Sequence, residues 1–405
     1  MRTIRLLTAI LATVVAPALF AQPRPVTRVT AIEAAITRGA RLAFAVADTA
    51  VARGLQLVAR AYPNPALSAS YSESTPRYHV GFELPVDYPW LRETRIKAAD
   101  ARRNAVQYRF RFERAAAALD ADTLYTLAQA RRAHADLSRR NALDADSLRR
   151  MAIARRDAGD ASDLDVETAT LFAGAQRNAA VADSLELFDV VLSLQTVMGL
   201  AADSIRVTLA DSLLAPTADA IRASTGIPLG VAAAQAGLDA AELITRLERR
   251  SRWAPPNIVA GFETRDPGGT WNKLLPTFGL TLPLPLLNWN RGAIALADAE
   301  RDRARAALAL VRAGTEAGIA HIVRERDQAL ARVERDRALI VSASRVAVMS
   351  LTAYREGAAP MASVLEAQRT AREVLGAYVN DLARAWIAIA TTRVLTLTAT
   401  PDSPQ

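Results

Sequence analysis

The sequence contains few residues that could carry out catalytic or metal-binding chemistry. It has no Cys and only three His, at positions 79, 134 and 321. This composition excludes disulfides, thiolate zinc sites and cysteine nucleophiles. His321 and Glu325 are four residues apart and could share one face of a helix, but with no further ligands nearby a surface pair is favoured over a metal site. We expect neither a metal nor a cofactor.

Motifs of the common enzyme classes are also missing. The sequence has no Gly-x-Ser-x-Gly turn, no phosphate-binding Gly-Lys-Ser/Thr loop and no His-Glu-x-x-His pair. The 50 Lys and Arg exceed the 42 Asp and Glu, which gives a net charge of +8. The two signs alternate along the chain, however, whereas a nucleic-acid footprint needs a face of one sign. We therefore expect neither an enzyme nor a nucleic-acid-binding protein.

The N-terminus is typical of a secretory signal peptide. Arg2 and Arg5 precede an apolar stretch over residues 6–20, and we expect cleavage after Ala21. A membrane anchor is the less favoured alternative, because Pro17 interrupts the stretch and the stretch is short for a bilayer span. The rest of the chain has no run of 18 apolar residues, so we expect an exported protein that is either soluble or a β-barrel.

The remaining chain is predicted to contain two copies of one large unit. The segment Gly-Phe-Glu-Leu-Pro-Val at 81–86 matches Gly-Leu-Thr-Leu-Pro-Leu at 279–284, and the same offset relates Gly159 to Gly357. We assign a first structural repeat to 22–200, a connector with a short strand and a short helix to 201–227, a second repeat to 228–397 and a C-terminal tail to 398–405.

Each repeat is predicted to begin with a helix. In the first repeat Thr30, with Glu33 three residues later, matches a capping box, and Pro63 ends the helix that follows. In the second repeat Pro228 is a favourable first residue for a helix that continues to about Trp253.

Very long helices without proline are predicted at 91–158 and 291–356, and their length favours coiled-coil packing over a globular core. Each ends next to a glycine that predicts a tight turn. A return helix follows each turn, to about Gly199 and Val394. The four tip residues are Gly159, Asp160, Gly357 and Ala358.

Strand signals lie between the first and the long helix of each repeat. Apolar and polar residues alternate at 67–72, 78–84, 258–263 and 277–284, which predicts two hairpins of strands about 9–11 residues long, with turns near 74–76 and 266–269. Alternation alone fits a soluble sheet and a membrane barrel equally well. Five aromatic residues near the strand ends could form a membrane girdle: Tyr88, Trp90, Trp253, Trp271 and Trp289.

A membrane location for these strands would require oligomerisation. Four strands leave two unpaired edges, which lipid does not tolerate. Two copies would close an eight-stranded barrel with a filled interior, and three copies a twelve-stranded barrel with room for a channel.

The ordered combination of signal peptide, repeat, hairpins, long helices and tip glycines resembles the TolC family of outer-membrane efflux factors. The stretch 354–369 around the second tip is the best local match. The resemblance implies an α+β membrane protein: a trimeric twelve-stranded β-barrel, four strands per chain, continued by a long α-helical coiled-coil barrel with an internal twofold repeat. It further implies an outer-membrane location extending into the periplasm and passive conduction. The implied partners are a periplasmic adaptor, which docks at the tips, and an inner-membrane pump.

The resemblance also suggests gate residues. The family narrows its periplasmic entrance with two acidic rings, whose positions here hold Ser363 and Glu366. An Asp–Tyr hydrogen bond that keeps the entrance shut corresponds to Asp165 and Tyr354. A basic residue that adds a further bridge is replaced by Ala359, so an entrance that opens more easily is expected. The alternative to a channel is a secreted periplasmic coiled-coil scaffold or adaptor without a pore, which accounts for the helices but not for the strands.

Overall fold

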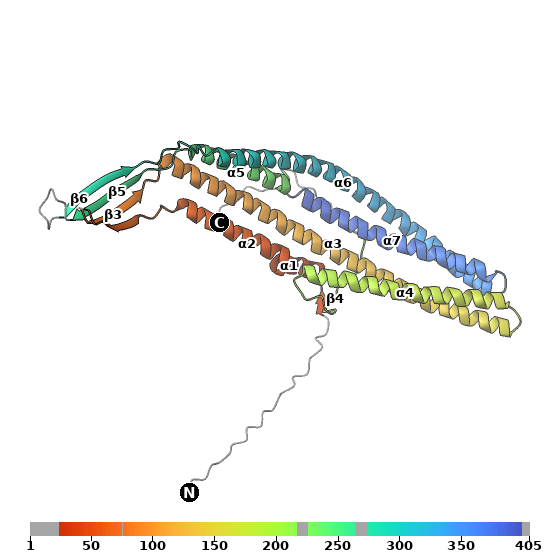
Figure 1. The fold of residues 1–405 in the computed structure, drawn as a ribbon. Coiled ribbons are helices and arrows are strands. Elements are labelled where there is room, and N and C mark those ends of the chain that lie inside the picture. Colours follow the sequence, from red (N-terminus) through yellow and green to blue (C-terminus); the bar gives the residue numbers. More distant parts are fainter. Residues whose placement is uncertain (1–23, 75, 217–225, 265–273, 399–405) are drawn as a thin grey trace, which may run out of the picture.

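A computed structural model describes residues 24–74, 76–216, 226–264 and 274–398. The chain forms a long, gently bent rod, with a small β-sheet at one end and two helical hairpin tips at the other (Figure 1). The expected signal peptide, the turn residues 266–269, Trp271 and all but the first residue of the expected tail lie outside the described residues.

The first helical segment differs from the prediction. Strand β1 (Arg24–Val26) leads into α1 (Arg28–Arg38) and α2 (Ala40–Arg60). The capping box lies three residues earlier than expected, since Thr27 is the N-cap and Thr30 takes the role predicted for Glu33. Gly39 separates the two helices because the chain packs tightly there: a Cβ atom on Gly39 would lie 2.9 Å from the carbonyl oxygen of Val197. Only a residue without a side chain allows this contact.

The sheet contains four antiparallel strands in the order β2 (Ala66–Tyr71), β3 (Tyr78–Pro85), β5 (Asn257–Thr264) and β6 (Leu275–Thr281). Both predicted hairpins are present, and β3 joins them by pairing with β5 from Tyr78↔Thr264 to Pro85↔Asn257. The described strands have six to eight residues, fewer than predicted. Strand β6 ends at Thr281, which pairs with Asn257, the first residue of β5, so the ladder stops where β5 begins.

The long helices confirm the prediction from the proline-free stretches. Helix α3 (Pro89–Asp157) has 69 residues and α6 (Arg291–Arg355) has 65, so each extends about 100 Å. Helix α4 (Asp163–Val197) returns along α3, and α7 (Met361–Leu395) returns along α6 (Figure 1). Helix α5 (Leu229–Arg250) packs against both α3 and α6, and α2 packs against α3. Many of the buried positions are alanines, which let the helix axes approach closely.

The connector joins the two halves near the middle of the rod. Its strand β4 (Val207–Leu209) pairs in parallel with β1. The phenol of Tyr125 on α3 donates to the carbonyl oxygen of Val26 at 2.9 Å, and the indole of Trp386 on α7 donates to that of Leu214 at 2.7 Å. The predicted connector strand is therefore present, whereas residues 217–225, where the short helix was expected, lie outside the described residues.

Candidate functional site

The two helical hairpins end in turns of the same geometry. Gly159 and Gly357 have φ angles of +82° and +76°, a left-handed conformation that favours glycine. In the first turn the amides of Gly159 and Asp160 donate to the carbonyl oxygens of Arg156 and Arg155. The second turn repeats the pattern from Gly357 and Ala358. Both helices thus end in the Schellman motif, which satisfies their last carbonyl groups.

A buried apolar cluster holds the two tips side by side. It combines residues of all four helices: Leu148, Ala152, Val166, Ala169, Tyr354, Met361 and Val364. Tyr354 is only 2% exposed and supplies the largest of these side chains. Because the cluster lies just behind the turns, it fixes the position of one hairpin relative to the other.

Arg155, in the last turn of α3, reaches across to the second tip. Its Nη1 donates to the carbonyl oxygen of Tyr354, and its Nη2 donates to that of Asp160 at 3.2 Å. The guanidinium carbon also lies 4.7 Å from the centre of the Tyr354 ring, a cation–π arrangement. Sequence patterns did not indicate Arg155, because a basic side chain in a last helical turn normally interacts with its own helix.

The expected Asp165–Tyr354 hydrogen bond is not formed within the chain. Asp165 instead completes a capping box, accepting from the amide of Ser162 at 3.2 Å. The hydroxyl of Tyr354 is buried and has no hydrogen-bond partner among the described residues. Burial raises the pKa of Tyr354, and the Asp165 carboxylate adds to this rise while the Arg155 guanidinium opposes it. The two residues are therefore near neighbours that do not bond.

The other predicted gate positions lie on the first turns of α7. Ser363 and Glu366 are both exposed and three residues apart, so they share a face of the helix. The hydroxyl of Ser363 donates to the carbonyl oxygen of Pro360 at 2.7 Å. Ala359 is half-buried and carries no charge. Of the two acidic positions expected from the resemblance, only Glu366 presents a carboxylate.

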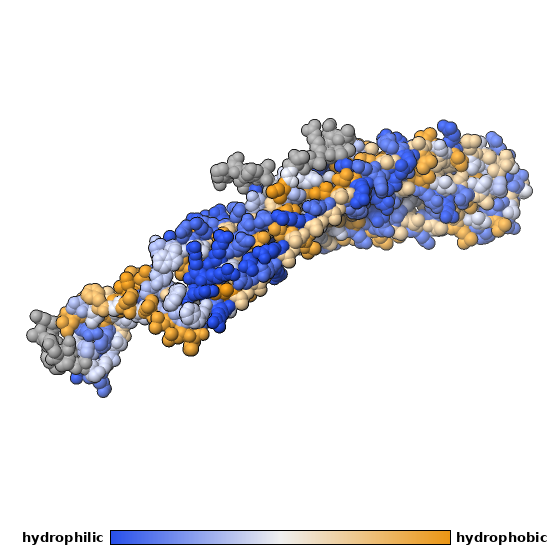
Figure 2. All heavy atoms as spheres, turned by 90° about the horizontal axis from the view of Figure 1, so that it is seen from above, coloured by the Kyte–Doolittle hydropathy of each residue, from blue (hydrophilic) through white to orange (hydrophobic). Residues whose placement is uncertain are grey.

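At the opposite end, the sheet has one apolar and one polar face. Tyr78, Val80, Phe82 and Leu84 of β3 point to one side with 46–49% of their surface exposed, and Figure 2 shows hydrophobic residues on this narrow end of the molecule. The polar face carries polar side chains in pairs: His79 Nδ1 lies 3.2 Å from Glu263, and Asn257 donates to Glu83 at 2.7 Å. Such a sheet can separate an apolar phase from a polar interior.

Four of the five predicted girdle residues gather where the sheet meets the helices. The rings of Tyr88 and Trp90 stack at 4.6 Å, and Trp253 and Trp289 meet edge to face at 5.9 Å. The three tryptophans are 42–55% exposed. Trp271 lies outside the described residues. Large amphipathic rings therefore lie at one level of the rod, between the apolar face of the sheet and the helices.

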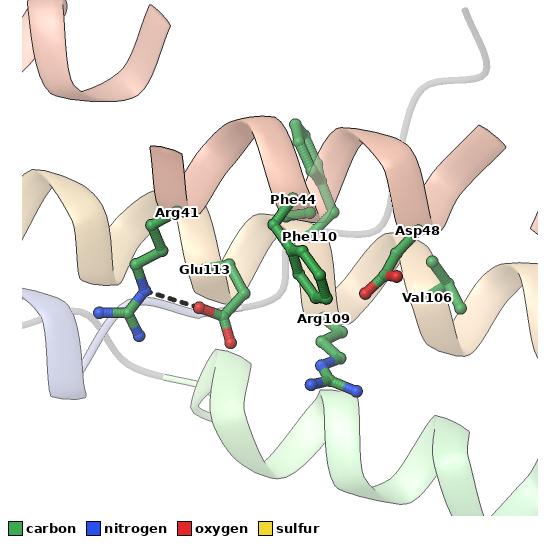
Figure 3. A pocket seen from close by; sticks show the side chains of 8 residues that line it. Arg41, Phe44, Asp48, Val106, Arg109, Phe110 and Glu113 are labelled. Carbon is green, nitrogen blue, oxygen red and sulfur yellow. Dashed lines mark hydrogen bonds and ion pairs between the residues drawn. The ribbon is translucent and has the colours of Figure 1, made fainter. Parts of the chain in front are cut away.

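The pocket between α2 and α3 offers little chemistry (Figure 3). The rings of Phe44 and Phe110 form its wall, and Arg41 Nε lies 2.7 Å from the Glu113 carboxylate, so these charges neutralise each other.

The pair His321 and Glu325, considered above as a metal site, is exposed on α6, and its two side chains are 3.7 Å apart. Within the described ranges, no group of three or more His, Asp or Glu side chains could hold a metal ion.

Comparison with solved structures identifies the fold. A membrane protein from Pseudomonas aeruginosa matches with a TM-score of 0.77 and 17% identity, over 91% of this chain and 93% of its own. The outer membrane protein VceC of Vibrio cholerae matches at 0.74 and 17%, over 92% and 96%. The CmeC outer membrane channel of Campylobacter jejuni matches at 0.77 and 11%, over 93% and 87%.

No family model and no curated protein matches the sequence. The structural matches nevertheless cover nine-tenths of the chain, and they confirm the resemblance to TolC-family outer-membrane channels at the level of the fold.

Proposed function

We propose that this chain, which has the fold of the TolC-family outer-membrane channels, is the exit channel of a tripartite efflux system. In this function it lies in the outer membrane, extends into the periplasm and passively conducts substrates delivered by an inner-membrane pump. The observation that carries the proposal is the bare apolar face of the sheet. Its residues include Phe278 at 83% exposure and Leu280 at 68%, and a soluble sheet would cover such a face.

A homotrimer accounts for the surfaces that one chain leaves uncovered. Strands β2 and β6 are the two sheet edges, and three copies joined edge to edge give twelve strands, enough for an open channel. The helices carry unpartnered apolar residues as well. On α4 these are Leu164, Leu171, Val181 and Leu185, and on α6 they are Leu310, Leu339, Val346 and Met349. We propose that these two stripes face each other between neighbouring protomers.

Apolar helix surfaces that one chain leaves uncovered also explain why two helical segments resemble membrane spans. Residues 28–60 and helix α6 are long and apolar enough to cross a bilayer, judged by length and composition. Only 11% of the apolar window of α6 is buried within the chain. In the proposed trimer this window packs against neighbouring helices in a periplasmic barrel, which requires an apolar helix surface without requiring lipid.

The tips are proposed as both gate and docking surface. Glu366 faces out from α7 near the second turn, and three copies would form one acidic ring at the entrance, with Ser363 in place of a second ring. The exposed tip residues Gly159, Asp160, Gly357 and Ala358 are the proposed contacts for a periplasmic adaptor. The equivalent order of elements in the two halves further supports an internal twofold repeat.

Planar-bilayer conductance of the detergent-purified mature protein tests the channel, after its mass has been measured by light scattering. We expect a trimer with discrete openings that prefer cations, and Glu366→Gln should weaken that preference. Glu167→Gln, which removes an exposed carboxylate near the first tip, is the matched control and should leave it unchanged. A water-soluble monomer without conductance would instead favour the coiled-coil scaffold.

A further inference from the structure

We propose that Arg155 is the residue that keeps the two tips of one protomer together and so holds the entrance closed. The inference rests on the proposed channel function. It assigns the closing contact to a guanidinium on α3 and not to the Asp165–Tyr354 pair suggested by the resemblance. Arg155 is a positioning residue, since it acts by placing α6 and α7 against α3 and α4.

The side chain of Arg155 makes three contacts. The guanidinium donates to carbonyl oxygens of both tips, at Tyr354 and at Asp160, and it lies over the Tyr354 ring. The accepting carbonyl of Tyr354 lies at the C-terminal end of α6, where the helix dipole favours a positive charge. Hydrogen bonds from a charged donor are stronger than neutral ones, and the planar guanidinium can serve both oxygens at once.

The other candidate contacts between the tips are weaker. Asp165 is hydrogen-bonded to Ser162 at the start of its own helix, the Tyr354 hydroxyl has no hydrogen-bond partner in the described part of the chain, and Ala359 has no charge. Apart from the apolar cluster, Arg155 is thus the side chain that forms polar bonds with both tips among the described residues. We therefore infer that a contact from the first tip, made by Arg155, keeps the entrance closed. This inference replaces the expectation that the entrance opens more easily because Ala359 lacks a charge.

Single-channel recording of Arg155→Gln tests this role. Losing a charge-assisted hydrogen bond should raise the ratio of open to closed channel by about tenfold. Arg155→Lys keeps the charge but not the planar double contact, so its effect should be intermediate. The matched control is Arg156→Gln. Arg156 is the next residue, and within the described ranges its ion pairs join it to Asp157 and Asp163 of its own tip. Unchanged gating in Arg155→Gln, or equal effects in Arg155→Gln and Arg156→Gln, would overturn the inference.

A second measurement does not depend on conductance. Because the chain has no Cys, spin labels can be attached only at the introduced pair Asp160→Cys and Ala358→Cys. We expect the distance distribution between the tips to broaden and lengthen in Arg155→Gln, while Arg156→Gln matches the parent. If even the parent protein shows no conductance, the channel proposal fails, and the distances still decide the role of Arg155. An unchanged distribution in a folded Arg155→Gln protein would overturn it.

Discussion

The two hairpin tips reach the same turn by different local means. Both place a glycine at positive φ and close the helix with the same pair of backbone bonds. After the turn, α4 begins with a complete Ser162–Asp165 capping box, whereas α7 begins after Pro360 without any side-chain cap. The first tip is therefore stabilised mainly by its own polar groups.

The second tip depends more on its neighbours. It contributes Tyr354, Met361 and Val364, each at most 2% exposed, to the shared apolar cluster, and it receives the guanidinium of Arg155 from the first hairpin. The comparison indicates that the first turn is stabilised by polar groups of its own tip, whereas the second tip keeps its position through contacts made by α3 and α4. Four experiments examine the two tips.

The largest expected effect comes from Tyr354→Ala. Removing a buried aromatic ring costs about 3–5 kcal/mol, so the free energy of opening the second tip should fall by that order. Amide hydrogen exchange resolved by peptide measures it, with protection lost at α6 and α7 before α3 and α4. Tyr62→Ala, at an exposed position near the sheet, serves as the control. Equal loss of protection at both tips would contradict the asymmetry.

The turn glycines should respond alike. Gly159→Ala and Gly357→Ala both force a side chain into the left-handed region, at a cost of about 1–2 kcal/mol each. No atom lies within 4 Å of a Cβ built on Gly159, so strain alone is expected there. Gly54→Ala, in the interior of α2 and equally unobstructed, should stabilise its helix slightly. Thermal unfolding measures the three variants. We expect the melting temperature to fall in Gly159→Ala and Gly357→Ala and to rise slightly in Gly54→Ala.

A smaller difference should separate two serines. Ser162→Ala removes the N-cap of α4 and should destabilise the first tip by about 1 kcal/mol. The hydroxyl of Ser363 only donates to the Pro360 carbonyl, so Ser363→Ala should change the second tip by less than about 0.5 kcal/mol. Hydrogen exchange at the start of α4 and α7 compares them. A larger loss of protection in Ser363→Ala than in Ser162→Ala would mean that a side chain caps the second tip and not the first.

The smallest effect appears only in alkali. The raised pKa of Tyr354 means that the folded state binds the phenolic proton more tightly than the unfolded state. The resulting stability is fully present below the ordinary tyrosine pKa of about 10, and it is lost as pH rises through the folded value. Subtracting the tyrosinate absorbance titration of Tyr354→Phe from that of the parent protein isolates this group. A difference midpoint at or below the ordinary value would contradict the buried environment.

The sequence predicted those features of the fold that depend on residues close to one another in the chain. The long helices, both hairpins and the glycine turns all follow from local periodicity and from glycine and proline. The break at Gly39 was missed because it reflects a contact with Val197, far away in the sequence. Arg155 was missed for the same reason, since its partner carbonyl belongs to Tyr354. Asp165 was assigned to the gate by resemblance, although its spacing from Ser162 also predicts the cap that it forms.

The pairing of β3 with β5 bears on the order in which the molecule folds. Each hairpin joins strands that are close in the chain, whereas Pro85↔Asn257 and its neighbours close a loop of more than 170 residues. Closing so long a loop from an unfolded chain costs about 3 kcal/mol more than closing a short hairpin. Helices α3 and α5 form from local contacts, and β3 directly precedes α3 while β5 directly follows α5, so the packing of these two helices brings the strands together beforehand. We therefore expect the apolar sheet to be completed late, which shortens the time that a newly made chain displays it to water.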